Sequence, residues 1–212
     1  MLPCMPTVRG EVEETVRAFC AARDYDAAAT AALRGYGPEI FSLVSALHSN
    51  EDDAADVFAM FSEALWRGLP KFGWQCSLRT WAYIVARNAS HRVRKLARRH
   101  AGHIPFQDSA VARVAQEVRT TTLPFLRSAQ RDRLAALRDT LSEDDKTLLV
   151  LRIDRDLAWD DLACVMLGSE SVEGDAALKR ESARLRKRFQ LVKERLVKLG
   201  KKKGLIKAGD GD

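Results

Sequence analysis

A basic segment at residues 72–95 mixes aromatic rings, an amide and cations, the side chains that proteins use to bind unstacked bases. On a helical wheel of residues 77–100, one stripe combines all three kinds: Trp81, Asn88, Arg92, Lys95 and Arg99. Rings stack on bases, an amide bonds a base edge, and cations hold phosphates. Phe72 and Trp74 precede this helix and add rings where a pocket for a flipped base needs walls.

The same predicted helix carries a separate apolar face. Its members recur at helical spacing and predict the seam that packs into a core: Leu78, Ala82, Val85, Ala89, Val93 and Leu96. Tyr83 lies on neither stripe and is predicted to pack at the surface. Ordinary packing explains the seam, but it does not require Trp81 and Asn88 outside it.

A second basic segment spans residues 176–207, where thirteen Lys/Arg face only Glu181 and Glu194. Its predicted helix keeps one apolar face: Leu178, Leu185, Phe189, Val192, Leu196 and Leu199. Helices predicted at 143–154 and 159–167 precede it, and Ser142 is the expected N-cap of the first. This order is typical of a helix-turn-helix with a basic last helix. A solvated charged helix or a coiled-coil strand is the alternative, although such helices normally interleave acids.

The composition indicates that the chain grips a polyanion at two places. The net charge of the 212 residues is +6, but between Glu63 and Asp108 the chain has nine Lys/Arg and no acidic residue. No apolar run is long enough to span a bilayer, and the first ten residues lack a signal-peptide pattern. We therefore expect a cytoplasmic protein.

Enzyme and metal chemistry are not expected. The four cysteines form no CxxC pair, the four histidines lie in or beside charged segments, and no glycine-rich phosphate loop is present. The sequence implies neither a metal ion nor a small cofactor.

Helical periodicity dominates the chain and predicts an all-α fold of two small helical domains joined by a flexible linker. The linker is expected where periodicity is weakest and Pro105, Pro124 and a run of threonines occur. The predicted division is an N-terminal extension with a helix (1–26), a first domain (27–103), the linker (104–127), a second domain (128–200) and a basic flexible tail (201–212).

The stretch from Gly37 to Lys95 resembles region 2 of bacterial RNA polymerase sigma factors of the sigma-70 family, in particular the extracytoplasmic-function (ECF) group. The matching residues keep the family register without gaps: Ala55, Asp56, Trp66, Phe72, Ser77, Trp81 and the Ala-Arg-Asn at 86–88. Family members usually carry Gln-Glu where this chain has Ala59 and Met60.

The resemblance implies two binding surfaces in the first domain. The helix around Asp56 would dock on core RNA polymerase, and the implied contacts are Asp56, Met60, Glu63 and Trp66. The following loop and helix would melt the minus-10 promoter element and trap a flipped base. Phe72 and Asn88 would form the pocket, with Trp81 at the edge of the melted duplex. The implied minus-10 contacts are Phe72, Trp74, Arg79, Trp81, Arg87, Asn88, Arg92 and Lys95.

The C-terminal segment resembles region 4 of the same family, a helix-turn-helix that reads the minus-35 element in the major groove. From Ala183 the run ARLRKRFQLVKERL aligns without gaps, although Leu191 replaces a frequent arginine and the turn at 168–175 is longer than usual. The implied minus-35 contacts are Arg184, Arg186, Lys187, Arg188, Gln190 and Leu191.

These resemblances predict a sigma factor with core RNA polymerase and promoter DNA as partners. Because the family usually has an anti-sigma factor, the resemblance also implies such a partner. The alternative is a two-domain helix-turn-helix regulator that binds duplex DNA and never engages polymerase. That alternative gives no use to Phe72, Trp74, Trp81 and Asn88.

Overall fold

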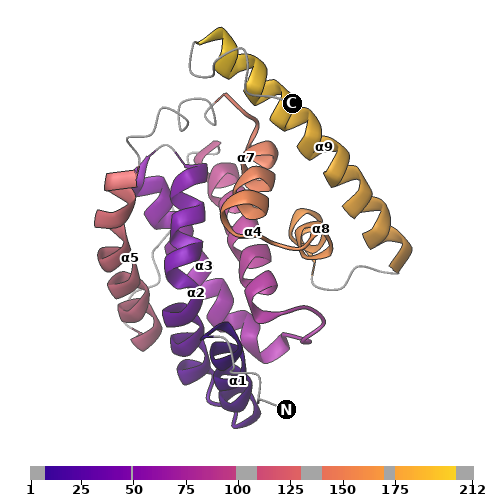
Figure 1. Ribbon diagram of the computed structural model, residues 1–212. Coiled ribbons are helices and arrows are strands. Elements are labelled where there is room, and N and C mark those ends of the chain that lie inside the picture. Colours follow the sequence, from indigo (N-terminus) through magenta and orange to yellow (C-terminus); the bar gives the residue numbers. More distant parts are fainter. Residues whose placement is uncertain (1–7, 49, 99–108, 130–139, 170–174, 204–212) are drawn as a thin grey trace, which may run out of the picture. The chain divides into compact units, whose positions relative to one another are not determined.

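The structure, a computed structural model, contains only helices in the residues that it describes, which confirms the predicted all-α fold (Figure 1). The described residues are 8–48, 50–98, 109–129, 140–169 and 175–203. The chain divides into two compact units, residues 1–124 and 125–212. Among the described helices, none is both long and apolar enough to cross a bilayer.

The first unit is built on three long helices and their flanking elements. It contains α1 (Val8–Ala21), α2 (Tyr25–Leu47), α3 (Glu51–Gly68), a 3-10 turn (Leu69–Lys71), α4 (Leu78–Arg98) and most of α5 (Ala110–Ala129). Side-chain caps fix two of the starts: Asp24 accepts the Ala27 N–H, and Asn50 accepts the Asp52 N–H.

The core of this unit lies where α2, α3 and α4 meet. Phe41 of α2 packs edge-on against Phe58 of α3 at a centroid distance of 5.2 Å, and Phe61 follows at 5.6 Å from Phe58. From α4, the predicted seam is confirmed, since Leu78, Ala82, Ala89 and Val93 are buried while Val85 and Leu96 are half-buried.

Tyr83 corrects the sequence-based expectation. It was predicted to lie at the surface, yet its exposed fraction is 0%, and by volume it ranks first among the fully buried side chains of the described residues. α4 contacts both α2 and α3, so its buried arc is wider than a single seam and includes the position of Tyr83.

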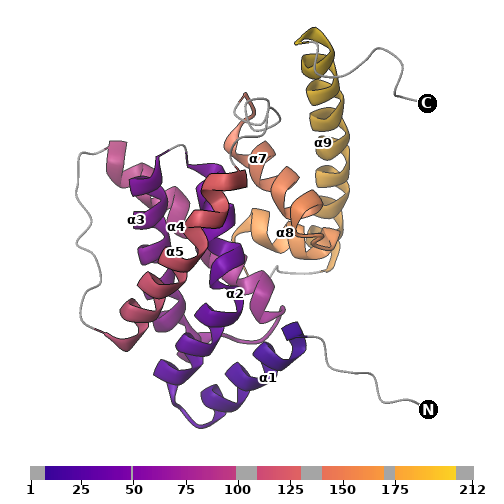
Figure 2. The ribbon, with the colours of Figure 1, turned by 60° about the vertical axis from the view of Figure 1, so that its left-hand side comes forward.

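α1 and α2 form a helical hairpin at one end of the unit (Figure 2). The two backbones approach closely at Gly35, where an added Cβ would lie 2.5 Å from Cγ1 of Val12. Only glycine leaves room for the valine there. Val16, about one turn after Val12 in α1, is fully buried, so apolar contacts anchor α1.

Helix α5 corrects the predicted linker. Residues 104–108 lie outside the described residues, but Ala110–Ala129 form a helix instead of an irregular connection. Its buried side chains recur at helical spacing: Val111, Val114, Ala115 and Val118. Burial of this apolar stripe against the first unit outweighs the low helix propensity of the threonine run and Pro124.

The second unit has a shorter set of helices: α7 (Glu143–Leu149), a π-helical turn (Val150–Asp154), α8 (Trp159–Leu167) and α9 (Asp175–Lys202). Ser142 is confirmed as the N-cap of α7, because its hydroxyl accepts the Asp145 N–H. Residues 130–139 and most of the turn between Gly168 and α9 lie outside the described residues.

The core of the second unit is made by the apolar face of α9 against α7 and α8. Leu185 and Val192 are buried as predicted, and Phe189 meets the Trp159 ring at 5.6 Å, edge to face. Ser182 extends this contact with hydrogen bonds to the Trp159 carbonyl (3.2 Å) and to Asp160 Oδ1 (2.6 Å). α9 is therefore held along one face.

A buried histidine joins the end of α2 to α4. His48 is 8% exposed, and its Nε2 lies 2.8 Å from the Ser90 hydroxyl. Burial, followed by the nearby Arg94 charge, lowers the pKa of His48 to about 4, and Asp53 offsets this only in part.

We therefore expect the first unit to lose stability as the pH falls from about 6.5 to about 4. The unfolded chain takes up a proton near the ordinary pKa of 6.5, whereas folded His48 resists it until about 4. Stability is full above pH 6.5 and falls by up to roughly 3 kcal/mol as the pH drops through this window. Urea unfolding of the wild-type and His48→Gln proteins between pH 7 and 4 measures this loss of stability. If the free energy of unfolding changes equally with pH in the two proteins, the expectation is contradicted.

Candidate nucleic-acid and polymerase-binding surfaces

The loop between the 3-10 turn and α4 brings three aromatic rings together. Phe72 stacks on Trp81 at a centroid distance of 4.5 Å with 17° between the planes, and it contacts Trp74 at 4.7 Å. Gly68 leaves room for this cluster, since an added Cβ would lie 2.8 Å from Cζ2 of Trp81. Trp74 itself has a left-handed backbone, with φ at 56°.

The three rings differ in how much surface they present. Phe72 is 6% and Trp81 7% exposed, whereas Trp74 is half-buried. The resemblance implied a place for Phe72 in the base pocket and for Trp81 at the edge of the melted duplex, with Trp74 as a further wall. In the folded loop, Phe72 covers Trp81, and Trp74 is the ring with the most accessible surface.

Beyond the rings, α4 presents a polar stripe. Asn88, Arg92 and Lys95 are exposed, and Arg87 is half-buried. Because seven residues of helix rise about 10 Å, Asn88 lies two turns beyond Trp81 on the same side of α4. The predicted ring, amide and cation types therefore share one face, whereas Arg99 lies outside the described residues.

Arg79, the first cation of α4, is committed to a different contact. Its guanidinium makes two hydrogen bonds to the Glu39 carboxylate of α2, at 2.8 and 3.1 Å, and the side chains are 13% and 17% exposed. Burial opposes the charged form, but the bonds to Glu39 and Tyr83 outweigh it and raise the pKa of Arg79. The structure therefore ties Arg79 to α2, where sequence reasoning expected a phosphate contact.

The exposed side of α3 carries most of the side chains expected to contact polymerase. Asp56 is exposed, and half-buried Glu63 pairs with Arg67 at 3.0 Å. The indole of half-buried Trp66 donates to Asp26 Oδ1 at 2.7 Å. Met60 differs, because it is 3% exposed and contributes to the core. The Met60 side chain faces the apolar interior. This burial corrects the expectation that it lies at the surface and contacts polymerase.

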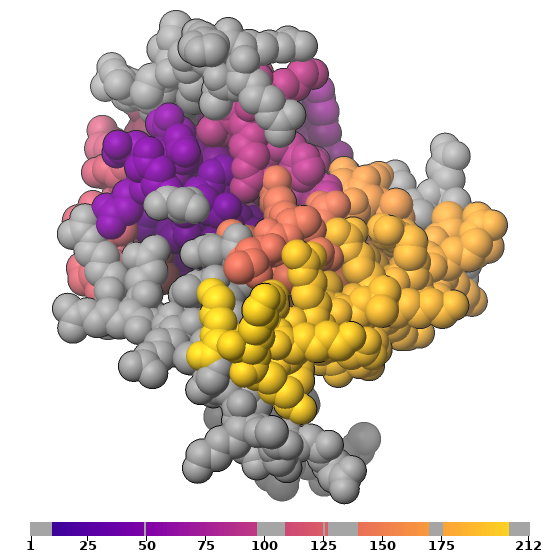
Figure 3. All heavy atoms as spheres, turned by 90° about the horizontal axis from the view of Figure 1, so that it is seen from above, coloured from indigo at the N-terminus to yellow at the C-terminus, as the bar shows by residue number. Residues whose placement is uncertain are grey.

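Atoms of α9 lie at the surface of the second unit, in gold and yellow in Figure 3. Lys187 and Gln190 are exposed, and Leu191 is an unusually exposed leucine at 65%. Arg184 is exposed and pairs with Glu181 at 2.6 Å, and the Arg186 guanidinium lies 5.6 Å from the Trp159 ring.

Arg188 is the exception on this face. Its Nε donates to Asp145 Oδ1 at 2.6 Å, and its Nη1 lies 3.6 Å from Asp144. The two aspartates belong to the first turn of α7, so Arg188 joins α9 to α7. Arg188, a predicted minus-35 contact, therefore also helps to hold α9 against α7.

Sequence reasoning assigned no role to the N-terminal helix, yet α1 reaches the aromatic loop. Glu13 accepts the Leu78 N–H at 3.2 Å, and the Arg17 guanidinium lies 4.2 Å from the Trp74 ring centroid. The contacts join residues more than fifty positions apart, and nothing in the local sequence pattern indicates them.

Comparison with known proteins identifies one part of the chain. Residues 32–102 match the family model described as Sigma-70 region 2. The match covers most of α2 and all of α3, the aromatic loop and α4. No curated protein and no solved structure matches the chain.

Proposed function

We propose that the chain is a sigma factor of the ECF group, which directs core RNA polymerase to promoters and opens the minus-10 element. The observation that carries the proposal is the position of the Sigma-70 region 2 match. It falls on the loop that carries Trp74 and on α4, which exposes Asn88, Arg92 and Lys95.

In this proposal the loop and α4 bind the displaced strand. Trp74 offers a stacking surface, and each stacked base contributes about 1–3 kcal/mol in other proteins. Asn88 bonds a base edge, while Arg87, Arg92 and Lys95 hold phosphates. Phe72 packs against Trp74 and stacks on Trp81, and Arg79 is left out because Glu39 holds it.

The exposed side of α3 is the proposed polymerase surface. Asp56, Glu63 and Trp66 lie along it, and two of them offer carboxylates to basic residues of a partner. A regulatory partner of the anti-sigma class would compete for the same side of the unit. Such a function belongs in the cytoplasm, where promoters and polymerase meet.

The second unit supplies the proposed upstream grip. α9 would enter the major groove at the minus-35 element, with Lys187, Gln190 and Leu191 as its most available side chains. Arg184 and Arg186 would contact phosphates or bases after exchanging their present partners. Two DNA-binding surfaces of modest affinity bind DNA more tightly when one chain links them, because binding of the first raises the effective concentration of the second.

The experiment is transcription by purified core polymerase of sheared genomic DNA from the source organism, with and without the protein. The proposal predicts transcripts that begin at a defined set of positions only when the protein is present. A helix-turn-helix regulator that never engages polymerase gives no such transcripts and no co-elution with core polymerase, and that result contradicts the proposal.

Asn88→Ala is expected to lower promoter opening about tenfold, which corresponds to loss of one good hydrogen bond. Asn88 is exposed on α4, whereas the proposed polymerase contacts belong to α3, so affinity for core polymerase is expected to stay unchanged. Gln116→Ala, an exposed amide on α5, is the matched control. Loss of core binding in the Asn88 variant counts against its place in the base pocket.

A further inference from the structure

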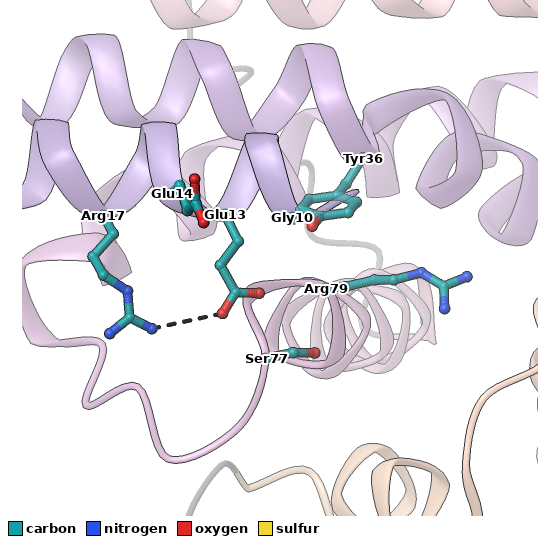
Figure 4. Close-up of a pocket in the computed structure, with 7 residues that line it drawn as sticks. All are labelled: Gly10, Glu13, Glu14, Arg17, Tyr36, Ser77 and Arg79. Carbon is teal, nitrogen blue, oxygen red and sulfur yellow. Dashed lines mark ion pairs between the residues drawn. The ribbon is translucent and has the colours of Figure 1, made fainter. Parts of the chain in front are cut away.

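Helix α1 contacts the aromatic loop through charged side chains (Figure 4). In the figure, Glu13 points from α1 toward the start of α4, and Arg17 pairs with it at 3.6 Å. The second carboxylate oxygen of Glu13 accepts the Leu78 N–H at 3.2 Å. The Glu13 carboxylate thus contacts Arg17 of its own helix and the first residue of α4, Leu78.

The bond to Leu78 completes the start of α4. The first N–H groups of a helix have no partner within it and need caps. Ser77 accepts the Thr80 N–H at 3.0 Å and so caps one of them. Glu13 satisfies the Leu78 N–H from a separate helix, which fixes where the loop ends and α4 begins.

Arg17 contacts a second point of the loop, the side chain of Trp74. Its guanidinium lies over the Trp74 ring at 4.2 Å from the centroid, a cation-π contact. Trp74 needs support, because its φ of 56° is unfavourable for a residue with a large side chain. Phe72 contacts the same ring at 4.7 Å, so the indole is held by two neighbours.

α1 is itself firmly placed. Val12 packs into the space above Gly35, and Val16 is fully buried. The helix can therefore serve as a fixed support for the loop. It also lies before residue 32, where the Sigma-70 region 2 match begins.

We propose that α1 sets the conformation of the base-binding loop, with Glu13 and Arg17 as positioning residues. A preorganised Trp74 is expected to bind the displaced DNA strand more tightly. This consequence rests on the proposed function, in which the loop binds that strand. A helix that only completes the core would leave the loop unchanged when these two side chains are altered.

The test uses the full chain with Glu13→Ala, Glu13→Gln, Arg17→Ala and the control Glu14→Ala, an exposed neighbour with the same charge. Amide exchange at Leu78 reports the cap. Fluorine NMR of 5-fluorotryptophan protein, with the Trp74 signal assigned from Trp74→Phe, reports the ring. Affinity for a single-stranded oligonucleotide with the non-template minus-10 sequence of a selected promoter reports the consequence.

We expect Glu13→Ala to speed Leu78 exchange and to weaken oligonucleotide binding, each about fivefold to tenfold, the effect of losing a helix cap. Glu13→Gln retains a carbonyl acceptor, so slow exchange is restored. Arg17→Ala shifts the Trp74 fluorine signal and weakens binding to a similar degree. Glu14→Ala matches wild type.

Unchanged exchange and fluorine signals in both alanine variants overturn the inference, as does unchanged oligonucleotide affinity or an equal effect of Glu14→Ala. If wild-type protein binds no oligonucleotide while exchange and fluorine signals change as expected, the proposed function fails and the positioning of the loop by α1 stands.

Discussion

Replacing Glu39 by alanine is expected to lower the free energy of unfolding of the first unit by about 3 kcal/mol. The substitution leaves the Arg79 guanidinium largely buried without its bidentate carboxylate. Desolvation then penalises the charge, and its interactions with Tyr83 are expected to offset that penalty only in part. Urea unfolding of the full chain, combined with amide exchange of buried α4 residues, measures the loss.

The chain contains a matched control for this ion pair. Arg34 and Glu117 lie 4.0 Å apart with side chains that are both 64% exposed. Glu117→Ala is expected to cost less than about 0.5 kcal/mol, because water solvates both charges. Replacing Glu39 and Arg79 together by apolar residues of similar size is expected to recover most of the loss. Equal effects of the two single substitutions contradict the buried-pair account.

Trp74→Ala is expected to weaken binding of single-stranded minus-10 DNA by about tenfold to a hundredfold, the range for loss of one stacked base. Stability is expected to change little, because the ring is half-buried and its loop backbone is already unfavourable. Fluorescence anisotropy with a labelled oligonucleotide measures the affinity, and thermal unfolding checks the fold.

Two substitutions separate the roles of the aromatic residues. Trp66→Ala removes a half-buried ring from α3 and is expected to weaken core polymerase binding without changing oligonucleotide affinity. Phe72→Ala is expected to destabilise the unit by about 3 kcal/mol, since this ring supports both Trp74 and Trp81. Oligonucleotide affinity that survives in Trp74→Ala rules out stacking by this ring.

Periodicity predicted α4, α8 and α9 and most of the buried residues of α4 and α9. The seam of α4 and the apolar face of α9 have the burial that their spacing predicts, and Ser142 caps α7 as its type and position indicate. These features depend on neighbours three or four residues away, so the sequence contains them directly. The helical character of α5 was missed, although Val111, Val114 and Val118 carry the same signal.

At the candidate site, contacts between distant residues could not be predicted. Arg79 and Arg188 are implied promoter contacts, but charge along the chain does not reveal that each has a carboxylate partner on another helix. Phe72 and Trp81 are buried because the loop folds back over α4, a path that a helical wheel cannot predict. The same holds for Glu13 and Arg17, whose partners lie across the unit.

The central claim is that the protein opens promoters together with core polymerase. Permanganate probing of a promoter fragment, chosen from the transcribed genomic DNA, tests it most directly, since permanganate oxidises unstacked thymines. The account predicts reactive thymines near the minus-10 element only when both core polymerase and protein are present, and fewer with Asn88→Ala. Thymines that stay unreactive in the complete mixture contradict it.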